Sequence, residues 1–188
     1  MYKLIAELEG KSPLSYGKPL VEPKKRGELA AAYEERCWRK RMHKTEKGQL
    51  FIPAMSFKLA LESAASGVRI PGEGRATYSK VMRSGVMVFE NVLLDATEDD
   101  IVCEQLFVPS DGKRGGSRRV LKYFPTLEKT WHGTVEIICI HPKLDPETLL
   151  RFLEDVGRFV GILRWRPENG GLYGRFVVKS HKVVKDVE

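Results

Sequence analysis

Basic and aromatic side chains are interleaved in several stretches of the chain, and their chemistry suits phosphates and unpaired bases. Arg and Lys neutralise phosphates, while flat Trp and Tyr rings stack on the bases of single strands. The stretches are CWRKRMHK from residue 37, GRATYSK from 74, GKRGGSRRVLKYF from 112 and RWRPENGGLYGRF from 164. Their candidate nucleic-acid-binding residues are Arg39, Lys40, Arg41, Arg75, Tyr78, Lys80, Lys113, Arg114, Arg118, Arg119, Lys122, Arg164, Trp165, Arg166, Tyr173 and Arg175.

The last of these stretches surrounds a glycine pair, Gly170 and Gly171, with charge. Glycine accepts positive φ angles and lets another backbone come close, and Arg164 and Arg175 bracket the turn. A phosphate could therefore be cradled there. In the alternative interpretation, Trp165 and the neighbouring rings pack onto the preceding helix and the arginines point into water. A solvated basic surface is likewise the alternative for each of the other stretches.

The sequence contains no motif typical of catalysis or metal binding. The histidines are scattered without metal-ligand spacing, and no GxSxG, HExxH or phosphate-loop motif occurs. The three cysteines form no CxxC pair, so neither a zinc site nor a disulfide framework is indicated. We expect no metal and no cofactor, and the motifs disfavour an enzyme. One alternative stays open, an endoribonuclease in which His43, helped by Tyr78 or Lys44, is the general base on a 2′-hydroxyl.

Length and composition indicate one soluble globular domain. The chain has 188 residues, of which 42% are hydrophobic and 30% charged, and this size is typical of a single core. The formal net charge of +7 favours a polyanionic partner. No apolar run approaches the roughly 18 residues that cross a bilayer, and residues 1–14 lack a signal-peptide pattern. We therefore expect a cytoplasmic protein without membrane contact.

Hydrophobic periodicity predicts an α+β fold. Helical signatures occur over residues 53–66, where Pro53 suits the first position, and over residues 145–161, where Asp145 suits the N-cap. Alternating or apolar runs predict strands over residues 2–9, 86–94, 104–109, 133–141 and 173–184. This order of elements is typical of a ferredoxin-like or modified RRM antiparallel sheet with two main helices.

Long basic insertions separate these elements within the single domain, residues 1–188. Residues 21–50 form a basic arm, with a short helix over 28–40, and contain no apolar period strong enough for a buried element. Residues 67–85 and 110–125 are predicted to be basic loops, because glycines and cations dominate them.

Two segments, FIPAMSFKLALESAA from residue 51 and GRFVGILRWRPENGGLYGRFVV from residue 157, resemble the CRISPR-associated RAMP superfamily. The resemblance is to the backbone subunits that coat guide RNA, whose first helix begins with a segment like IPGSSLKGALR and whose Gly-rich turn follows a late helix. The residues that match the first segment are Ile52, Pro53, Ser56, Lys58, Ala60 and Leu61. The resemblance implies a modified RRM core in which Lys58 touches a backbone phosphate.

The resemblance also implies that the loops around residues 75–83 and 110–122 lie over the strand, and that copies assemble side by side on nucleic acid. It is equally compatible with a relative carried by a bacteriophage or mobile element. The sequence thus predicts non-catalytic binding of single-stranded nucleic acid, with RNA favoured over DNA by the resemblance, and with other CRISPR or phage proteins as partners. The alternatives are the endoribonuclease and a phage protein that binds a host nucleic-acid-handling protein.

Overall fold

The computed structural model describes residues 1–109 and 118–185, which form two antiparallel sheets. The main sheet has the order β3-β5-β8-β1-β9, with β4 also paired to β8. Its strands are β1 (Tyr2–Gly10), β3 (Gln49–Ile52), β4 (Val86–Met87), β5 (Val92–Thr97), β8 (His132–Cys139) and β9 (Phe176–Lys185). The second sheet has the order β2-β7-β6, formed by β2 (Leu14–Ser15), β7 (Arg119–Leu127) and β6 (Ile101–Pro109).

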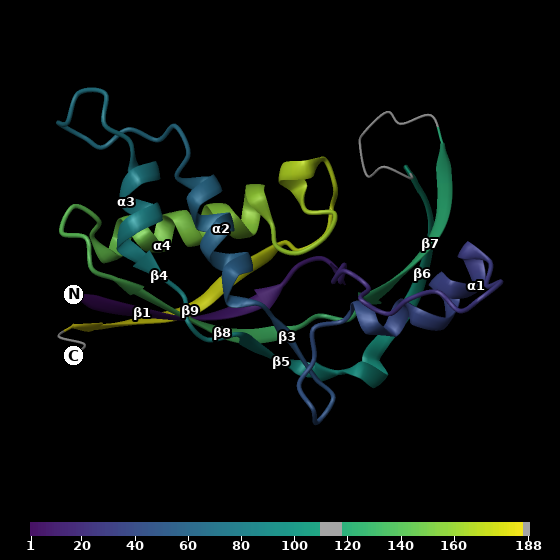
Figure 1. Ribbon diagram of the computed structural model, residues 1–188. Helices are drawn as coiled ribbons and strands as arrows, with labels where there is room; N and C mark the ends of the chain where they lie inside the picture. Colours follow the sequence, from purple (N-terminus) through teal and green to yellow (C-terminus); the bar gives the residue numbers. More distant parts are fainter. Residues whose placement is uncertain (110–117, 186–188) are drawn as a thin grey trace.

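Three helices cover one face of the main sheet, and in the part of the chain that the structure describes the opposite face has no helix over it (Figure 1). The covering helices are α2 (Ala54–Ala64), α3 (Tyr78–Gly85) and α4 (Pro146–Asp155), and α4 continues as a single π-type turn, η3 (Val156–Val160). The other helical elements are α1 (Ala30–Cys37) and the short turns η1 (Trp38–Arg41), η2 (Glu98–Asp100) and η4 (Pro167–Asn169).

Side-chain alternation explains why β1 can be covered on one face and open on the other. Leu4, Ala6 and Leu8 are fully buried, whereas Glu7 between them is exposed. Since successive strand residues point to opposite faces, the apolar set meets the helices and the polar set faces solvent. β1 is the central partner of β8 and β9, so its alternation sets the polarity of both faces of the sheet.

Local signals explain where α4 begins and how it is held. Asp145 accepts a hydrogen bond from the backbone N–H of Thr148 at 2.9 Å, and Pro146 occupies the first helical position. The apolar stripe that includes Leu149 and Leu153 is completely buried against the sheet. The helix is therefore fixed by an N-terminal cap and by one buried face.

A cluster of large rings fills the core beside the end of β1. Phe176 lies between Phe57 and Trp131, with ring centroids 5.9 and 6.2 Å away. Gly10 makes this packing possible, since a Cβ at this position would lie 2.1 Å from the Trp131 indole nitrogen. The buried apolar side chains of the main sheet and of α2, α3 and α4 belong to one hydrophobic cluster, which also includes Leu14, Ile101 and Leu127 of the second sheet.

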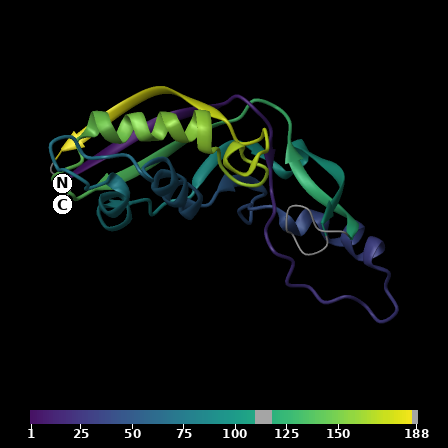
Figure 2. The same ribbon diagram turned by 90° about the horizontal axis from the view of Figure 1, so that it is seen from above.

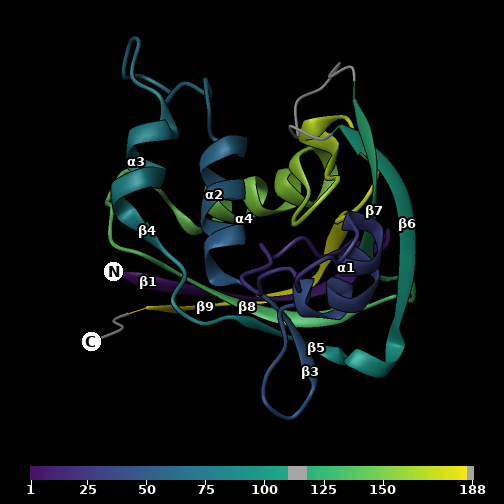
Figure 3. The same ribbon diagram turned by 45° about the vertical axis from the view of Figure 1, so that its right-hand side comes forward.

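The part of the arm that contains α1 and η1 lies at the other end of the molecule from the start of β1, whereas residues 49–50 of the arm already belong to β3 (Figure 2). At that other end the β6–β7 hairpin stands up beside the main sheet, and α1 and η1 pack against β7 (Figures 1 and 3). The hairpin, the arm and the chain after η3 consequently meet in one region. Among the described residues, no helix is long and apolar enough to cross a membrane.

The predicted α+β fold with an antiparallel sheet is confirmed, and so are its main elements. The strands predicted at both ends of the chain are β1 and β9, the helices predicted from residues 53 and 145 are α2 and α4, and residues 28–40 form α1 and most of η1. The predicted strand over 86–94 is interrupted, because β4 and β5 are separated by residues 88–91.

Two segments predicted to be loops contain regular structure. Residues 119–125 lie in β7, where they pair with β6 from Arg119 opposite Pro109 to Leu127 opposite Ile101. Tyr123 and Phe124 are buried there. Residues 78–85 form α3. The loop predictions were wrong at these positions because the segments obtain their buried partners from elsewhere in the chain, which local composition does not reveal.

Candidate nucleic-acid interface

The guanidinium group of Arg164 is stacked inside the protein rather than pointing into water. It lies 3.4 Å from the centroid of the Phe124 ring on β7 and 4.6 Å from that of Trp165. The Arg41 guanidinium of η1 lies 5.3 Å from the same Phe124 ring. Burial lowers the pKa of Arg164 to about 10. Desolvated cation–π contacts of this kind contribute about 2 kcal/mol, so Arg164 stabilises the junction between these segments.

A polar network ties the late turn, residues 163–175, to the second sheet. The Tyr173 hydroxyl donates to Glu104 on β6 at 3.0 Å, and Thr126 on β7 donates to the other oxygen of the same carboxylate at 3.0 Å. Burial and the Glu104 carboxylate raise the pKa of Tyr173. We call Arg41, Glu104, Phe124, Arg164 and Tyr173 the Arg164 cluster. Within it, the predicted site residues Arg164 and Tyr173 have packing roles. This differs from both interpretations of the stretch, since the alternative placed the arginines in water.

The glycine pair of the late turn serves the chain's own backbone. Gly170 has a positive φ of 77°, as expected, and closes the η4 turn. Gly171 is required by a close approach, since a Cβ there would lie 1.9 Å from the Trp165 carbonyl oxygen. Leu163 and Trp165 also have positive φ angles, which are uncommon for residues with a side chain. The close approach at Gly171 is therefore made by the Trp165 carbonyl group of the same turn.

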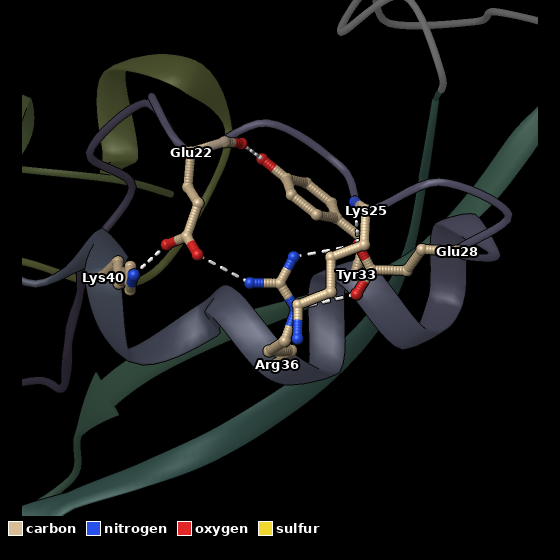
Figure 4. A network of polar contacts seen from close by, with 6 residues as sticks. All are labelled: Glu22, Lys25, Glu28, Tyr33, Arg36 and Lys40. Atoms are coloured by element: carbon tan, nitrogen blue, oxygen red, sulfur yellow. Dashed lines mark hydrogen bonds and ion pairs between the residues drawn. The ribbon is translucent and has the colours of Figure 1, made fainter.

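In the arm, carboxylates engage many of the cations (Figure 4). The Arg36 guanidinium donates to Glu28 at 2.7 and 2.9 Å and to Glu22 at 2.7 Å, while Lys40 pairs with the other oxygen of Glu22. Hydrogen bonding from Arg36 lowers the pKa of Glu28 to about 2. Arg41 forms an ion pair with Glu34 at 2.7 Å and is buried. The predicted binding residues Lys40 and Arg41 are thus engaged within the arm.

Two further predicted site residues also have internal roles. Tyr78 is 5% exposed and packs edge-on against Phe152 of α4, with 5.3 Å between ring centroids, so its ring cannot stack on a base. Lys58 donates to the backbone carbonyls of Met82 and Arg83 at the end of α3 and pairs with Glu62 at 3.1 Å. Those carbonyls have no intrahelical partner, so the ammonium group of Lys58 stabilises the C-terminal end of α3.

The remaining arginines of the late turn are partly engaged as well. Arg166 pairs with Glu168 at 2.9 Å, and the Arg175 side chain donates to the Arg158 carbonyl. Trp165 is 41% exposed and packs beside Tyr173, with ring centroids 6.0 Å apart. Most of this stretch therefore shapes the turn, and Trp165 offers the largest partly open ring.

A second set of predicted residues keeps its charge available. The described carboxylates make no ion pair with these side chains, which are exposed except for the half-buried Lys122: Arg39, Arg75, Lys80, Arg118, Arg119 and Lys122. Arg39 covers the ring of Trp38, 4.7 Å from its centroid. The predicted residues Lys113 and Arg114 lie outside the described residues.

Apart from Arg39, which lies in η1 of the arm, these available cations come from segments that reach two ends of the helix-bearing side of the molecule. The segment before α3, which carries Arg75, projects from one end, and the outer end of the β6–β7 hairpin, where Arg119 begins β7, projects from the other (Figure 1). Both project to the side on which the helices cover the main sheet. A strand whose phosphates contact both ends would run across the helix-bearing side.

Several carboxylates gather in a groove on the open face of the main sheet, a feature that the basic stretches of the sequence do not predict. A groove of about 810 Å³ is lined by five carboxylates: Glu7, Glu9, Glu90, Asp95 and Glu136. Lys11 and Lys179 lower the pKa of Glu9 to about 2. RRM domains stack bases on the open sheet face. Lys3 pairs with Glu136, and Lys11 and Lys179 pair with Glu9, whereas no described cation pairs with Glu7 or Glu90. The charge of Glu7 and Glu90 disfavours phosphates, so this part of the face is poorly suited to a strand.

The proposed histidine site of an endoribonuclease is not assembled. The His43 ring is half-buried between Tyr16 and Phe51, with ring centroids 6.2 and 5.6 Å away. Lys44 pairs with Glu98, and Tyr78 is buried against α4. The three residues that the alternative combined therefore serve different contacts. Among residues 1–109 and 118–185, no three metal-binding side chains cluster, and all three cysteines are free.

The six-stranded antiparallel sheet covered on one face by helices agrees with the α+β fold predicted from the sequence, and the chain shares this fold with solved structures. Two solved structures with this fold are similar to the chain. One is a chain of the type III-B Cmr-beta assembly bound to cognate target RNA, with a TM-score of 0.60, 13% identity and 98% of this chain covered. The other is Cmr6 from Pyrococcus furiosus, with a TM-score of 0.51, 14% identity and 95% of this chain covered.

The two structures differ in how much of their own length is matched. The chain spans 61% of the Cmr-beta chain and 99% of Cmr6. No protein-family model matches the sequence, and no curated protein matches it. At these identities the likeness establishes the fold, and the site must be argued from the residues of this chain.

Proposed function

We propose that the protein binds single-stranded RNA without cutting it, as a RAMP-type subunit of a CRISPR ribonucleoprotein complex. The observation that carries the proposal is the segregation of charge on a RAMP fold: available cations on the helix-bearing side and carboxylates on the open sheet face. The similar Cmr-beta chain comes from an assembly solved with target RNA bound, which supports RNA as the ligand.

The binding side chains in this proposal are the available cations of the helix-bearing side and the hairpin. They neutralise backbone phosphates, a contact that carries no sequence information. Trp165 supplies a partly open ring for stacking, and such a contact is worth about 1 to 3 kcal/mol per base. The cationic set is Arg39, Arg75, Lys80, Arg118, Arg119 and Lys122.

We propose that the chain is one RAMP domain with insertions at residues 21–50, 67–85 and 110–125. In the assembled complex, this domain lies beside further subunits along the RNA strand. Copies of this chain or other CRISPR proteins are the proposed neighbours. The acidic open face supports this arrangement, since a face unsuited to RNA is available to a protein.

The test is the salt dependence of binding to an unstructured oligoribonucleotide, followed by fluorescence anisotropy. Each phosphate contact with a single strand contributes a slope of about −0.7 in log K against log salt. About five contacts therefore predict a loss of affinity of about a hundredfold between about 50 and about 200 mM salt. A 2′-deoxy strand of the same sequence measures how much the ribose contributes.

The control variant is Lys182→Gln, which removes one exposed charge from β9, away from the proposed contacts. It should bind like the unchanged protein, and the strand should remain intact in both. An affinity that does not change with salt would reject the proposal, as would cleavage of the strand. Stable capture of a protein partner without any RNA affinity would favour a protein-binding role instead.

A further inference from the structure

A small basic pocket lies beside the start of α3, where the preceding loop meets the turn between β8 and α4. Its volume is about 300 Å³. Polar or charged side chains from both segments line it: Glu73, Arg75, Thr77, Lys80, His141 and Lys143. The pocket is therefore formed by parts of the chain that are about 60 residues apart in sequence.

Backbone contacts hold both walls in place. On one side, residues 69–77 form a closed turn in which Ile70 N–H donates to the Ala76 carbonyl at 2.9 Å. On the other, Ile140 N–H donates to the Gly85 carbonyl at 2.9 Å. A Cβ at Gly85 would lie 2.4 Å from the Cβ of His141, so glycine lets the His141 turn sit against α3. The pocket is a built feature of the fold.

The pocket has a surplus of positive charge. Lys143 pairs with Glu73 at 2.6 Å, which neutralises both. Arg75 and Lys80 remain, and the carboxylates in the described part of the chain make no ion pair with either of them. Two permanent positive charges therefore have no counterion within the pocket.

Hydrogen-bond donors complete the pocket. His141 Nδ1 accepts from the backbone N–H of Lys143 at 3.2 Å, which leaves its Nε2 as the donor of the neutral ring. Thr77 precedes α3 but its side chain makes no capping hydrogen bond to the helix, so its hydroxyl can serve a ligand. These groups suit a small oxyanion that carries several acceptor oxygens.

We propose that this pocket binds a terminal phosphomonoester of the RNA strand, an inference that rests on the proposed function and specifies one of its contacts. A terminal phosphate carries close to two negative charges at neutral pH, because its second pKa is about 6. That charge matches the two unpaired cations. An internal phosphodiester carries one charge and both of its ends continue as chain, so it fits a groove better than a small pocket.

The experiment compares three strands of one sequence, with a 5′-phosphate, a 3′-phosphate or hydroxyl groups at both ends. The unchanged protein should bind one phosphorylated strand about tenfold more tightly than the hydroxyl-ended strand. His141→Gln with Lys143→Gln should remove this preference, because it deletes a donor and exposes the Glu73 carboxylate. The affinity of that variant for the hydroxyl-ended strand should stay within about twofold.

A variant that should strengthen the preference for the phosphorylated strand provides a second test. Glu73→Gln frees the Lys143 ammonium group and should increase the preference for the phosphorylated strand by about threefold. Lys182→Gln lowers the net charge by one, as the change at Lys143 does, so it is the charge-matched control for the double variant and should preserve the preference. Circular dichroism and the melting temperature establish that each variant is folded.

The outcomes separate this inference from the proposed function. Equal affinity for all three strands overturns the terminal-phosphate site while leaving RNA binding intact. If the unchanged protein binds none of the three strands, the proposed function is contradicted. In that case, titration with a nucleoside 5′-monophosphate tests the pocket by itself: a shift of the His141 ring resonances supports the site, and unchanged resonances reject it.

Discussion

Two basic regions of the molecule use their cations in different ways. In the arm and the Arg164 cluster, Arg36, Arg41 and Arg164 are paired with carboxylates or stacked on rings inside the protein. Around α3 and at the start of β7, Arg75 and Arg119 have no described carboxylate as an ion-pair partner. Basic stretches of the sequence therefore correspond mainly to folding contacts in the first region, with Arg39 as the exception, and to available ligand contacts in the second.

The difference predicts that substitutions in the first region change stability and those in the second change RNA affinity. Carboxylates decide which role a cation has, because an ion pair within the chain must be broken before a phosphate can replace it. The following substitutions test that division.

The largest effect is expected for Arg164→Ala. Loss of the stack on Phe124 and of the packing of the late turn should reduce the free energy of unfolding by about 2 kcal/mol or more. Arg166→Ala removes only the pair with Glu168 and should cost less than about 1 kcal/mol. Urea unfolding of both variants measures the difference. Equal stability of the two variants would contradict a folding role for Arg164.

At the start of β7, Arg118→Gln with Arg119→Gln should weaken RNA binding and leave stability unchanged. Both side chains are exposed. Loss of two phosphate contacts should lower affinity by about tenfold and reduce the salt slope by about 1.4. Anisotropy titrations at several salt concentrations provide both numbers. An unchanged slope would show that the strand does not reach this end of the hairpin.

In the arm, Glu22→Gln with Glu28→Gln should convert paired cations into available ones. Arg36 and Lys40 lose their carboxylate partners, so RNA affinity should rise by about threefold while the arm loses a small part of its stability. The matched control is Glu46→Gln, since Glu46 is exposed and makes no ion pair within the described residues. Identical affinity of both variants would mean that the arm lies away from the strand.

The smallest expected effect is on the pH dependence of the folding stability. Burial and the nearby charge of Lys18 lower the pKa of His43 below its ordinary value of about 6.5. The unfolded chain therefore binds the proton first as pH falls, and stability decreases from about pH 6.5 downwards until the folded protein is protonated too. His43→Gln should flatten the melting temperature across this window.

Carboxylates produce a separate decline at lower pH, which serves as the internal reference. Hydrogen bonds from the backbone of Thr148 and Thr97 lower the pKa values of Asp145 and Asp100. Their contribution is lost below the unfolded carboxyl pKa of about 4. That decline should persist in His43→Gln. A profile that is identical in both proteins above about pH 5 would exclude His43 as its cause.

The sequence predicts the fold well where an element carries its own signals. The cap and stripe of α4 and the alternation of β1 depend on neighbouring residues, so periodicity identifies them. β7 is different, because Tyr123 and Phe124 become buried only through β6, Arg41 and Arg164, which are distant in sequence. Composition alone therefore predicted a basic loop over part of a strand.

The candidate site is less predictable for the same reason. Counting Arg and Lys identifies every basic stretch but not the partners of these cations. Glu22, which pairs with Lys40, lies 18 residues away from it, and Phe124, which stacks on Arg164, lies 40 residues away. Which cations are neutralised is a property of the tertiary structure. The signal that was available and unused is the alternation in β1, which places Glu7 and Glu9 on the face opposite Leu8 and so indicates an acidic sheet face.

The three cysteines differ in exposure, and this gives the unmodified chain a single labelling site. Cys37 and Cys139 are buried, whereas Cys103 is exposed on β6 near Arg39. A maleimide dye should therefore attach at one position, next to the junction of arm and hairpin. Partial desolvation of the sulfur raises the pKa of the Cys103 thiol, so the reaction will be slower at neutral pH than for a free cysteine. Fluorescence from that dye would follow movements of the hairpin relative to the arm during ligand binding.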